Sequence, residues 1–166
     1  MLQILSRTPA WVFILLGFLL ALGLLQTRDR WVKRPIAYVL PVAMVALSLA
    51  GVLSSFGLKA LPPIAGWLIG LLVVALAGRA AFLQSFAPFV SFDVQKNQFF
   101  IPGSWAPLVV IMAIFCTKYA LAVAQARGMT VAPSAAAGLG LFFGACSGYF
   151  AARALALRTV AQQLGA

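Results

Sequence analysis

The sequence predicts an all-α membrane protein, a bundle of five transmembrane helices with a short structured cytoplasmic loop. Of its 166 residues, 64% are hydrophobic and 8% are charged, whereas a soluble domain is about 45–50% apolar and about 25% charged. A transmembrane helix needs about 20 apolar residues, so five helices fit in this length with room for loops. Disorder is excluded because it requires low hydrophobicity. We therefore expect one integral membrane domain over residues 1–166.

Five apolar runs, separated by proline, glycine or charged residues, give the positions of the predicted helices. The predicted spans cover about residues 9–26, 35–56, 61–79, 105–125 and 133–155. The first run is short for a span but long for the apolar part of a signal peptide, and no small-residue cleavage site follows it. The second and third spans are joined by a very short link, which predicts an antiparallel hairpin of helices.

The predicted cytoplasmic loop, residues 84–104, is rich in phenylalanine. Residues 92–94 and 99–101 flank the polar segment 95–98, and this arrangement is typical of a β-hairpin. The alternative is an interfacial segment whose phenylalanine side chains lie in the lipid headgroup layer. We favour an interfacial association and leave the hairpin open.

The charges are strongly biased, with 12 basic residues, 2 acidic residues and no histidine. The cations lie at the ends of apolar runs rather than on one face, which favours contact with anionic lipid headgroups over nucleic-acid binding. Arg28, Arg30, Lys33 and Arg34 form a basic loop that we interpret as a determinant of topology and a headgroup contact.

Counting the loop cations predicts the orientation of the chain. If the basic loop is cytoplasmic, eight cations are inside and three are outside. The inside set is Arg28, Arg30, Lys33, Arg34, Arg79, Lys96, Arg153 and Arg158, and the outside set is Arg7, Lys59 and Arg127. We therefore expect a multi-pass protein of the bacterial inner membrane with a periplasmic N-terminus and a cytoplasmic C-terminus.

The scarcity of acids and the absence of histidine exclude several kinds of chemistry. Asp29 and Asp93 are the only acidic side chains. Magnesium and calcium sites use several carboxylates, catalytic zinc uses histidine, and glycosidases use paired acids. The sequence contains neither a glycine-rich phosphate loop nor a nucleophile–base pair. We expect no catalytic residue, no metal and no cofactor.

Small residues recur at every fourth position in the fifth span, where Gly140, Gly144 and Gly148 lie on one face. Gly66 and Gly70 form a second such pair in the third span. A glycine costs up to about 1 kcal/mol in a helix relative to alanine, and small residues allow a second helix to approach closely. We favour packing within the monomer, with a dimer face as the alternative.

Lys118 is the one ionisable residue clearly inside a predicted span. It lies about 20 Å along the fourth helix, past the midplane toward the outer face. With Tyr119 it is a candidate contact for an anionic substrate or lipid. The alternative is a lysine that extends its charge to the outer interface, and we favour this alternative.

The two cysteines, Cys116 and Cys146, fall inside the fourth and fifth spans at similar expected depths. A thiol redox pair is one interpretation. We favour two small buried apolar side chains, because neither cysteine belongs to a Cys-x-x-Cys motif.

Two stretches also carry a resemblance to a known family. One is residues 8–13 followed by 23–30, and the other is residues 100–108 leading to 114–119. They resemble an uncharacterised family of small proteobacterial inner-membrane proteins, known as a domain of unknown function. A fainter likeness, in the basic loop before a proline-opened second helix, is to CcdC-like membrane proteins. The resemblance implies no activity, but it draws attention to Gln26, Arg28, Lys118 and Tyr119.

These observations predict a non-enzymatic accessory, assembly or oligomeric membrane component. Its expected partners are membrane lipids with anionic headgroups, and a second copy or another membrane protein. Two alternatives stay open. The first is a small transporter or lipid-handling protein that uses Lys118 as an anion partner. The second is an intramembrane thiol redox protein that uses Cys116 and Cys146.

Overall fold

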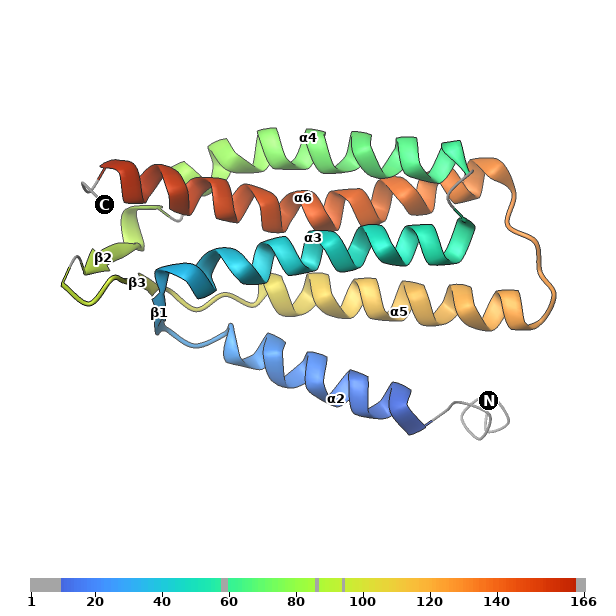
Figure 1. The fold of residues 1–166 in the computed structure, drawn as a ribbon, viewed down its shortest axis with the longest axis horizontal. Helices are drawn as coiled ribbons and strands as arrows, with labels where there is room; N and C mark the ends of the chain where they lie inside the picture. The colour runs from blue at the N-terminus through green and yellow to red at the C-terminus, as the bar shows by residue number, and fades with distance from the viewer. Residues whose placement is uncertain (1–9, 58–59, 86, 94, 164–166) are drawn as a thin grey trace. The chain divides into compact units, whose positions relative to one another are not determined.

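A computed structural model describes residues 10–57, 60–85, 87–93 and 95–163 (Figure 1). The chain forms two compact units, Met1–Asp29 with Pro102–Gly128, and Arg30–Ile101 with Met129–Ala166. The first unit contains the helices α2 (Ala10–Leu25) and α5 (Ala106–Ala126). The second contains α3 (Arg34–Phe56), α4 (Leu61–Ser85), a 3-10 turn η1 (Ala87–Phe89) and α6 (Pro133–Gln163), with the strands β1 (Arg30–Lys33), β2 (Ser91–Asp93) and β3 (Gln98–Ile101).

Four of these helices, α3, α4, α5 and α6, are long and apolar enough to cross a membrane. The helix α2 has 16 residues, which is a length of about 24 Å against the roughly 30 Å of a hydrocarbon core. The prediction of five equivalent spans is therefore corrected to four helices of spanning length and one shorter apolar helix. Residue 9, where the first span was expected to begin, and residues 58–59 of the short link lie outside the described residues.

Two helices extend beyond the ends that the sequence predicted. The helix α4 continues past Arg79 to Ser85, and α6 continues past residue 155 to Gln163. An arginine does not end a helix, and the segment after residue 155 is rich in alanine, leucine and glutamine, which are good helix formers. With 31 residues, α6 is about 46 Å long, so about a third of it exceeds the thickness of a hydrocarbon core.

The predicted loop contributes β2 and β3 to a three-stranded antiparallel sheet with the order β1-β3-β2. The hairpin alternative is the observed one, because β2 pairs with β3 in a register that places Phe92 opposite Phe99. Its turn is closed by the backbone N–H of Lys96, which donates to Asp93 Oδ1 at 3.0 Å. At Asn97 the backbone is left-handed with φ 49°, a conformation that asparagine tolerates. Residue 94 lies outside the described residues.

The basic segment predicted as a loop is in part the third strand of this sheet. The strand β1 pairs with β3, and Trp31 lies opposite Phe100 with ring centroids 5.4 Å apart. The strand β1 has four residues, and only Val32 is buried. This alternation of apolar and polar residues is too short to be recognised as a strand from the sequence.

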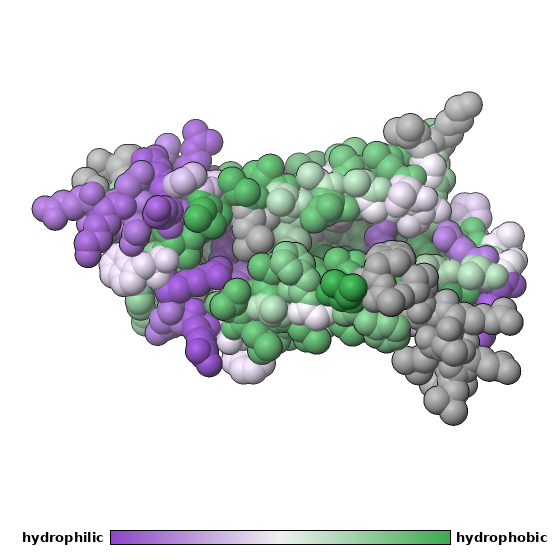
Figure 2. Space-filling view, turned by 60° about the horizontal axis from the view of Figure 1, so that its bottom comes forward, coloured by the Kyte–Doolittle hydropathy of each residue, from purple (hydrophilic) through white to green (hydrophobic). Residues whose placement is uncertain are grey.

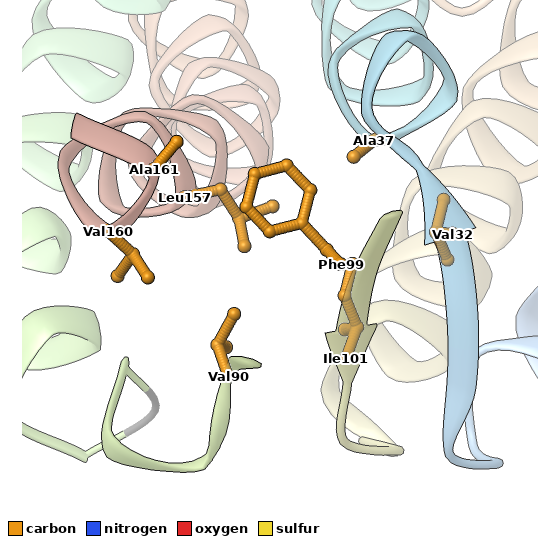
Figure 3. Packing of buried hydrophobic residues seen from close by; sticks show 8 residues of the cluster. All are labelled: Val32, Ala37, Val90, Phe99, Ile101, Leu157, Val160 and Ala161. Atoms are coloured by element: carbon orange, nitrogen blue, oxygen red, sulfur yellow. The ribbon is translucent and has the colours of Figure 1, made fainter. Parts of the chain in front are cut away.

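A buried cluster joins this sheet to the ends of two helices (Figure 3). Its centre is Phe99, which is 0% exposed and whose ring points toward Leu157 of α6 in Figure 3. The other members are Val32, Ala37, Val90, Ile101, Val160 and Ala161. The sheet therefore covers the last turns of α6 and the first turn of α3, which places the additional length of α6 in a small folded region.

In the first unit, the end of α2 meets the beginning of α5. The backbone N–H of Ser104 donates to the carbonyl of Gln26 at 2.9 Å. The backbone N–H of Gly103 donates to Asp29 Oδ1 at 2.7 Å. At Gly103, a Cβ atom would overlap the backbone carbonyl of Thr27, so the two turns approach as closely as glycine allows.

Candidate functional site

The glycines predicted to pack helices lie where α4 contacts α6. A Cβ atom at Gly140 would overlap the backbone of Pro63, and one at Gly144 would overlap the backbone of Trp67. In return, a Cβ atom at Gly66 or Gly70 would overlap backbone atoms of α6. Gly148 faces the carbonyl of Leu71 and the side chain of Val74 in the same way. The glycine stripe of α4 and the glycine stripe of α6 therefore pack against each other within one chain.

The order of these contacts shows that α4 and α6 run in the same direction. Pro63 faces Gly140 near the start of α4. At the other end, Arg79 Nη2 donates to Thr159 Oγ1 at 3.4 Å. Sequence positions therefore increase together along both helices, and their carboxyl ends lie together at the end that carries the sheet.

A polar network ties α3 to this helix pair. Ser48 Oγ of α3 donates to the carbonyl of Phe143 at 3.2 Å and accepts the indole N–H of Trp67 at 3.2 Å. Ser48 and Trp67 are both buried. Because a buried indole N–H needs an acceptor, the serine satisfies a group of α4 while it bonds to α6. We did not predict this network from the sequence, although a serine inside an apolar helix was the available signal.

The second polar region lies at the end of the helix pair that carries the sheet, where Arg153 of α6 is 6% exposed. Tyr149, one turn earlier, hydrogen bonds to the Arg153 side chain, and the positive charge of Arg30 acts on Arg153 as well. Burial lowers the pKa of the Arg30 guanidinium, because desolvation disfavours its charged form. Two guanidinium groups in this unit, Arg30 on β1 and Arg153 on α6, are thus partly or fully withdrawn from water.

The remaining basic residues of the predicted headgroup contact differ in exposure. Arg28 and Lys33 are exposed, whereas Arg30 and Arg34 are half-buried. Both acids accept backbone hydrogen bonds, Asp29 from the distant Gly103 and Asp93 from the nearby Lys96. From the sequence, Arg153 was predicted only as one of the cations on the inner side. Its position four residues after Tyr149 was a signal for pairing along one helix face.

Lys118 and Tyr119 lie in the middle of α5. Lys118 is the thirteenth of its 21 residues, about 18 Å from its start, and it is half-buried. The ring of Tyr119 stacks with that of Phe115, with centroids 6.3 Å apart and planes at 7°. The structure therefore places the candidate pair on a helix of spanning length.

The cysteines are both free thiols and belong to different units. Cys116 on α5 is exposed, and Cys146 on α6 is buried. Within the described residues, no three side chains among histidine, cysteine, aspartate and glutamate form a group that could hold a metal ion.

The sides of the helices are mainly hydrophobic at their surface (Figure 2). On α4, the face directed away from α6 exposes large apolar side chains, of which Leu76 is 69% exposed. The others are Leu68, Ile69, Leu72 and Val73. Exposed apolar faces of this size mark contact with lipid or with a protein partner.

Four helices are long and apolar enough to cross a membrane, and their apolar faces are exposed. These features are those of a helical membrane protein. The chain belongs to the family described as "Family of unknown function (DUF6622)", which matches residues 1–165. The expected membership of an uncharacterised family is thereby confirmed. No curated protein and no solved structure shows significant similarity to the chain.

Proposed function

We propose that this protein is a multi-pass component of the bacterial inner membrane that acts without catalysis, as an accessory or assembly factor for another membrane protein. The bias of basic residues supports a cytoplasmic C-terminus and, with α2 crossing the membrane as a fifth helix, a periplasmic N-terminus. On this orientation, the sheet and the carboxyl ends of α4 and α6 face the cytoplasm.

The observation that carries this proposal is that both acidic side chains accept hydrogen bonds from the backbone. Asp29 accepts the N–H of Gly103, and Asp93 accepts the N–H of Lys96, so each carboxylate holds a turn in place. General acid–base work needs a side chain that can reach a substrate in the required protonation state. Carboxylates engaged in turns support a structural role for both.

The contact between α4 and α6 supports a partner other than a second copy joined through the glycine stripe. A dimer through Gly140, Gly144 and Gly148 would have to displace α4, which already fills that face. The apolar face of α4 around Leu72 and Val73 is available to a partner helix.

Affinity purification from native membranes in mild detergent tests the proposal. The tagged chain is compared with a variant that carries Cys116→Ala, Lys118→Met and Cys146→Ala, and the co-purifying proteins are quantified. We expect one protein at near-equal amounts with both chains, because the replaced side chains belong to the alternative functions.

Two results would contradict this function. One is purification of both chains without a stoichiometric protein partner. The other is anion transport in proteoliposomes that the triple variant loses, which would support the transporter alternative through Lys118.

A further inference from the structure

We propose that Arg79 of α4, oriented by Thr159 of α6, binds the phosphate of an anionic phospholipid at the end of the helix pair that carries the sheet. The inference goes beyond an accessory role. It rests on the membrane location in the proposed function, which would put this site in the cytoplasmic leaflet, but it requires no protein partner.

The first argument is the depth of Arg79 along its helix. The helix α4 begins at Leu61, and Arg79 is its nineteenth residue. At 1.5 Å per residue, Arg79 lies about 27 Å from the start of α4, and a hydrocarbon core is about 30 Å thick. The contact with Thr159 marks the same level on α6. A guanidinium at this level of a spanning helix lies within reach of the headgroup phosphates.

The second argument is that Arg79 is accessible at the end of an apolar surface. Its side chain is exposed. Leu76 and Leu72 precede it by three and seven residues, so all three lie on one face of α4. Leu76 is 69% exposed and Leu72 is 55% exposed. An exposed apolar stripe that ends in a cation matches a phospholipid, whose acyl chains end in an anionic headgroup.

The third argument is the charge and orientation of the guanidinium. Neither α4 nor α6 contains an acidic residue, so an anion at Arg79 meets no negative side chain from either helix. Arg79 Nη2 donates to Thr159 Oγ1 at 3.4 Å, and this hydroxyl donates to the carbonyl of Leu155 at 3.1 Å. The hydroxyl therefore orients the guanidinium, whose other N–H groups match the oxygen atoms of a phosphate.

The test uses the full chain, purified in detergent and titrated with phosphatidylglycerol, and native mass spectrometry counts the bound lipids. Phosphatidylcholine measures selectivity for the anionic headgroup, and inorganic phosphate distinguishes a lipid from a free anion. Arg79→Gln removes the proposed contact. Arg158→Gln is the matched control, because Arg158 is also an exposed arginine, next to Thr159 in the chain, and this substitution removes the same charge. Thr159→Val removes the orienting hydroxyl, and Thr159→Ser keeps it.

We expect Arg79→Gln to bind phosphatidylglycerol about ten-fold more weakly than the parent chain, and Arg158→Gln to bind it within about two-fold of the parent. Thr159→Val should bind about three-fold more weakly although it keeps every charge, and Thr159→Ser should bind like the parent. Circular dichroism shows whether each variant is folded, and if Arg79→Gln is unfolded, the two Thr159 variants decide.

Several results would overturn the proposal. Unchanged binding by Arg79→Gln is one. Equal weakening by Arg79→Gln and Arg158→Gln is another, because the effect would then follow from net charge alone. Equal binding of phosphatidylcholine, or displacement of the lipid by millimolar inorganic phosphate, would also contradict a phospholipid site. Purification of the chain without a protein partner would leave these lipid measurements unchanged.

Discussion

Replacing Gly144 by alanine isolates the energy of the contact between α4 and α6. The added Cβ atom would overlap the carbonyl and Cα atoms of Trp67, which are backbone atoms and cannot rotate away. The two helices must therefore separate locally. Gly138 is the matched control, because it lies on the same helix and a Cβ atom there meets nothing within 4 Å.

The expected magnitudes follow from two opposing terms. Alanine is favoured over glycine in a helix by about 1 kcal/mol, so Gly138→Ala should raise the free energy of unfolding by up to that amount. At Gly144 the same gain is opposed by an overpacking cost of about 1–3 kcal/mol. Since the helix-propensity term is common to both variants, their difference in unfolding free energy should equal the overpacking cost.

Equilibrium unfolding in mixed micelles of a mild detergent and dodecyl sulfate measures this difference. Circular dichroism follows the helix content, and tryptophan fluorescence follows the four tryptophans, of which Trp67 lies beside the mutated position. We expect Gly144→Ala to unfold at a lower dodecyl sulfate fraction than Gly138→Ala. Equal midpoints for the two variants would refute the close packing of α4 on α6.

Three further substitutions test other parts of the structure by the same unfolding measurement. Phe99→Ala should lower the free energy of unfolding by about 3–5 kcal/mol, because the ring is fully buried. Phe89→Ala should lower it little, because that side chain is 67% exposed. Similar losses for both variants would contradict the position of the sheet cluster. Ser48→Ala should lower the free energy of unfolding by about 1 kcal/mol and shift the tryptophan emission, because it removes the acceptor of the Trp67 indole N–H. An unchanged emission spectrum would argue against the hydrogen bonds of Ser48. Gln26→Met should be neutral or stabilising, because Gln26 Nε2 is buried without a hydrogen-bond partner among the described residues, and a loss above about 1 kcal/mol would reveal an acceptor for that amide.

The periodic and compositional signals in this chain were strong enough to predict its helices. Long apolar runs have few alternatives to a helix in a membrane, so the starts of α3, α4 and α6 were predicted to within one residue. The end of α3 was also predicted correctly, but the ends of α4 and α6 were not, because Arg79 and Arg158 looked like interfacial stops, whereas both helices continue into a folded region outside the expected spans.

The sheet and the polar contacts form between residues that are far apart in the chain, so local sequence patterns did not predict them. The strand β1 exists because β3 is available to pair with it, from almost 70 residues away along the chain. Similarly, the burial of Arg153 near the end of α6 depends on how that helix packs in the folded chain, which the sequence did not indicate. The glycine stripes were visible from spacing alone, but their mutual fit needed the parallel alignment of α4 and α6.

The most direct test is whether the β2–β3 turn, which precedes α5 in the chain, and the turn that follows α5 lie on opposite sides of a membrane. In a variant with Cys116→Ser and Cys146→Ser, a single cysteine is introduced by Arg127→Cys or by Lys96→Cys, both at exposed positions. We expect a membrane-impermeant maleimide to label Arg127→Cys in intact spheroplasts, and to label Lys96→Cys only after lysis. Labelling of both positions from the same side would contradict a multi-pass membrane protein built on these helices.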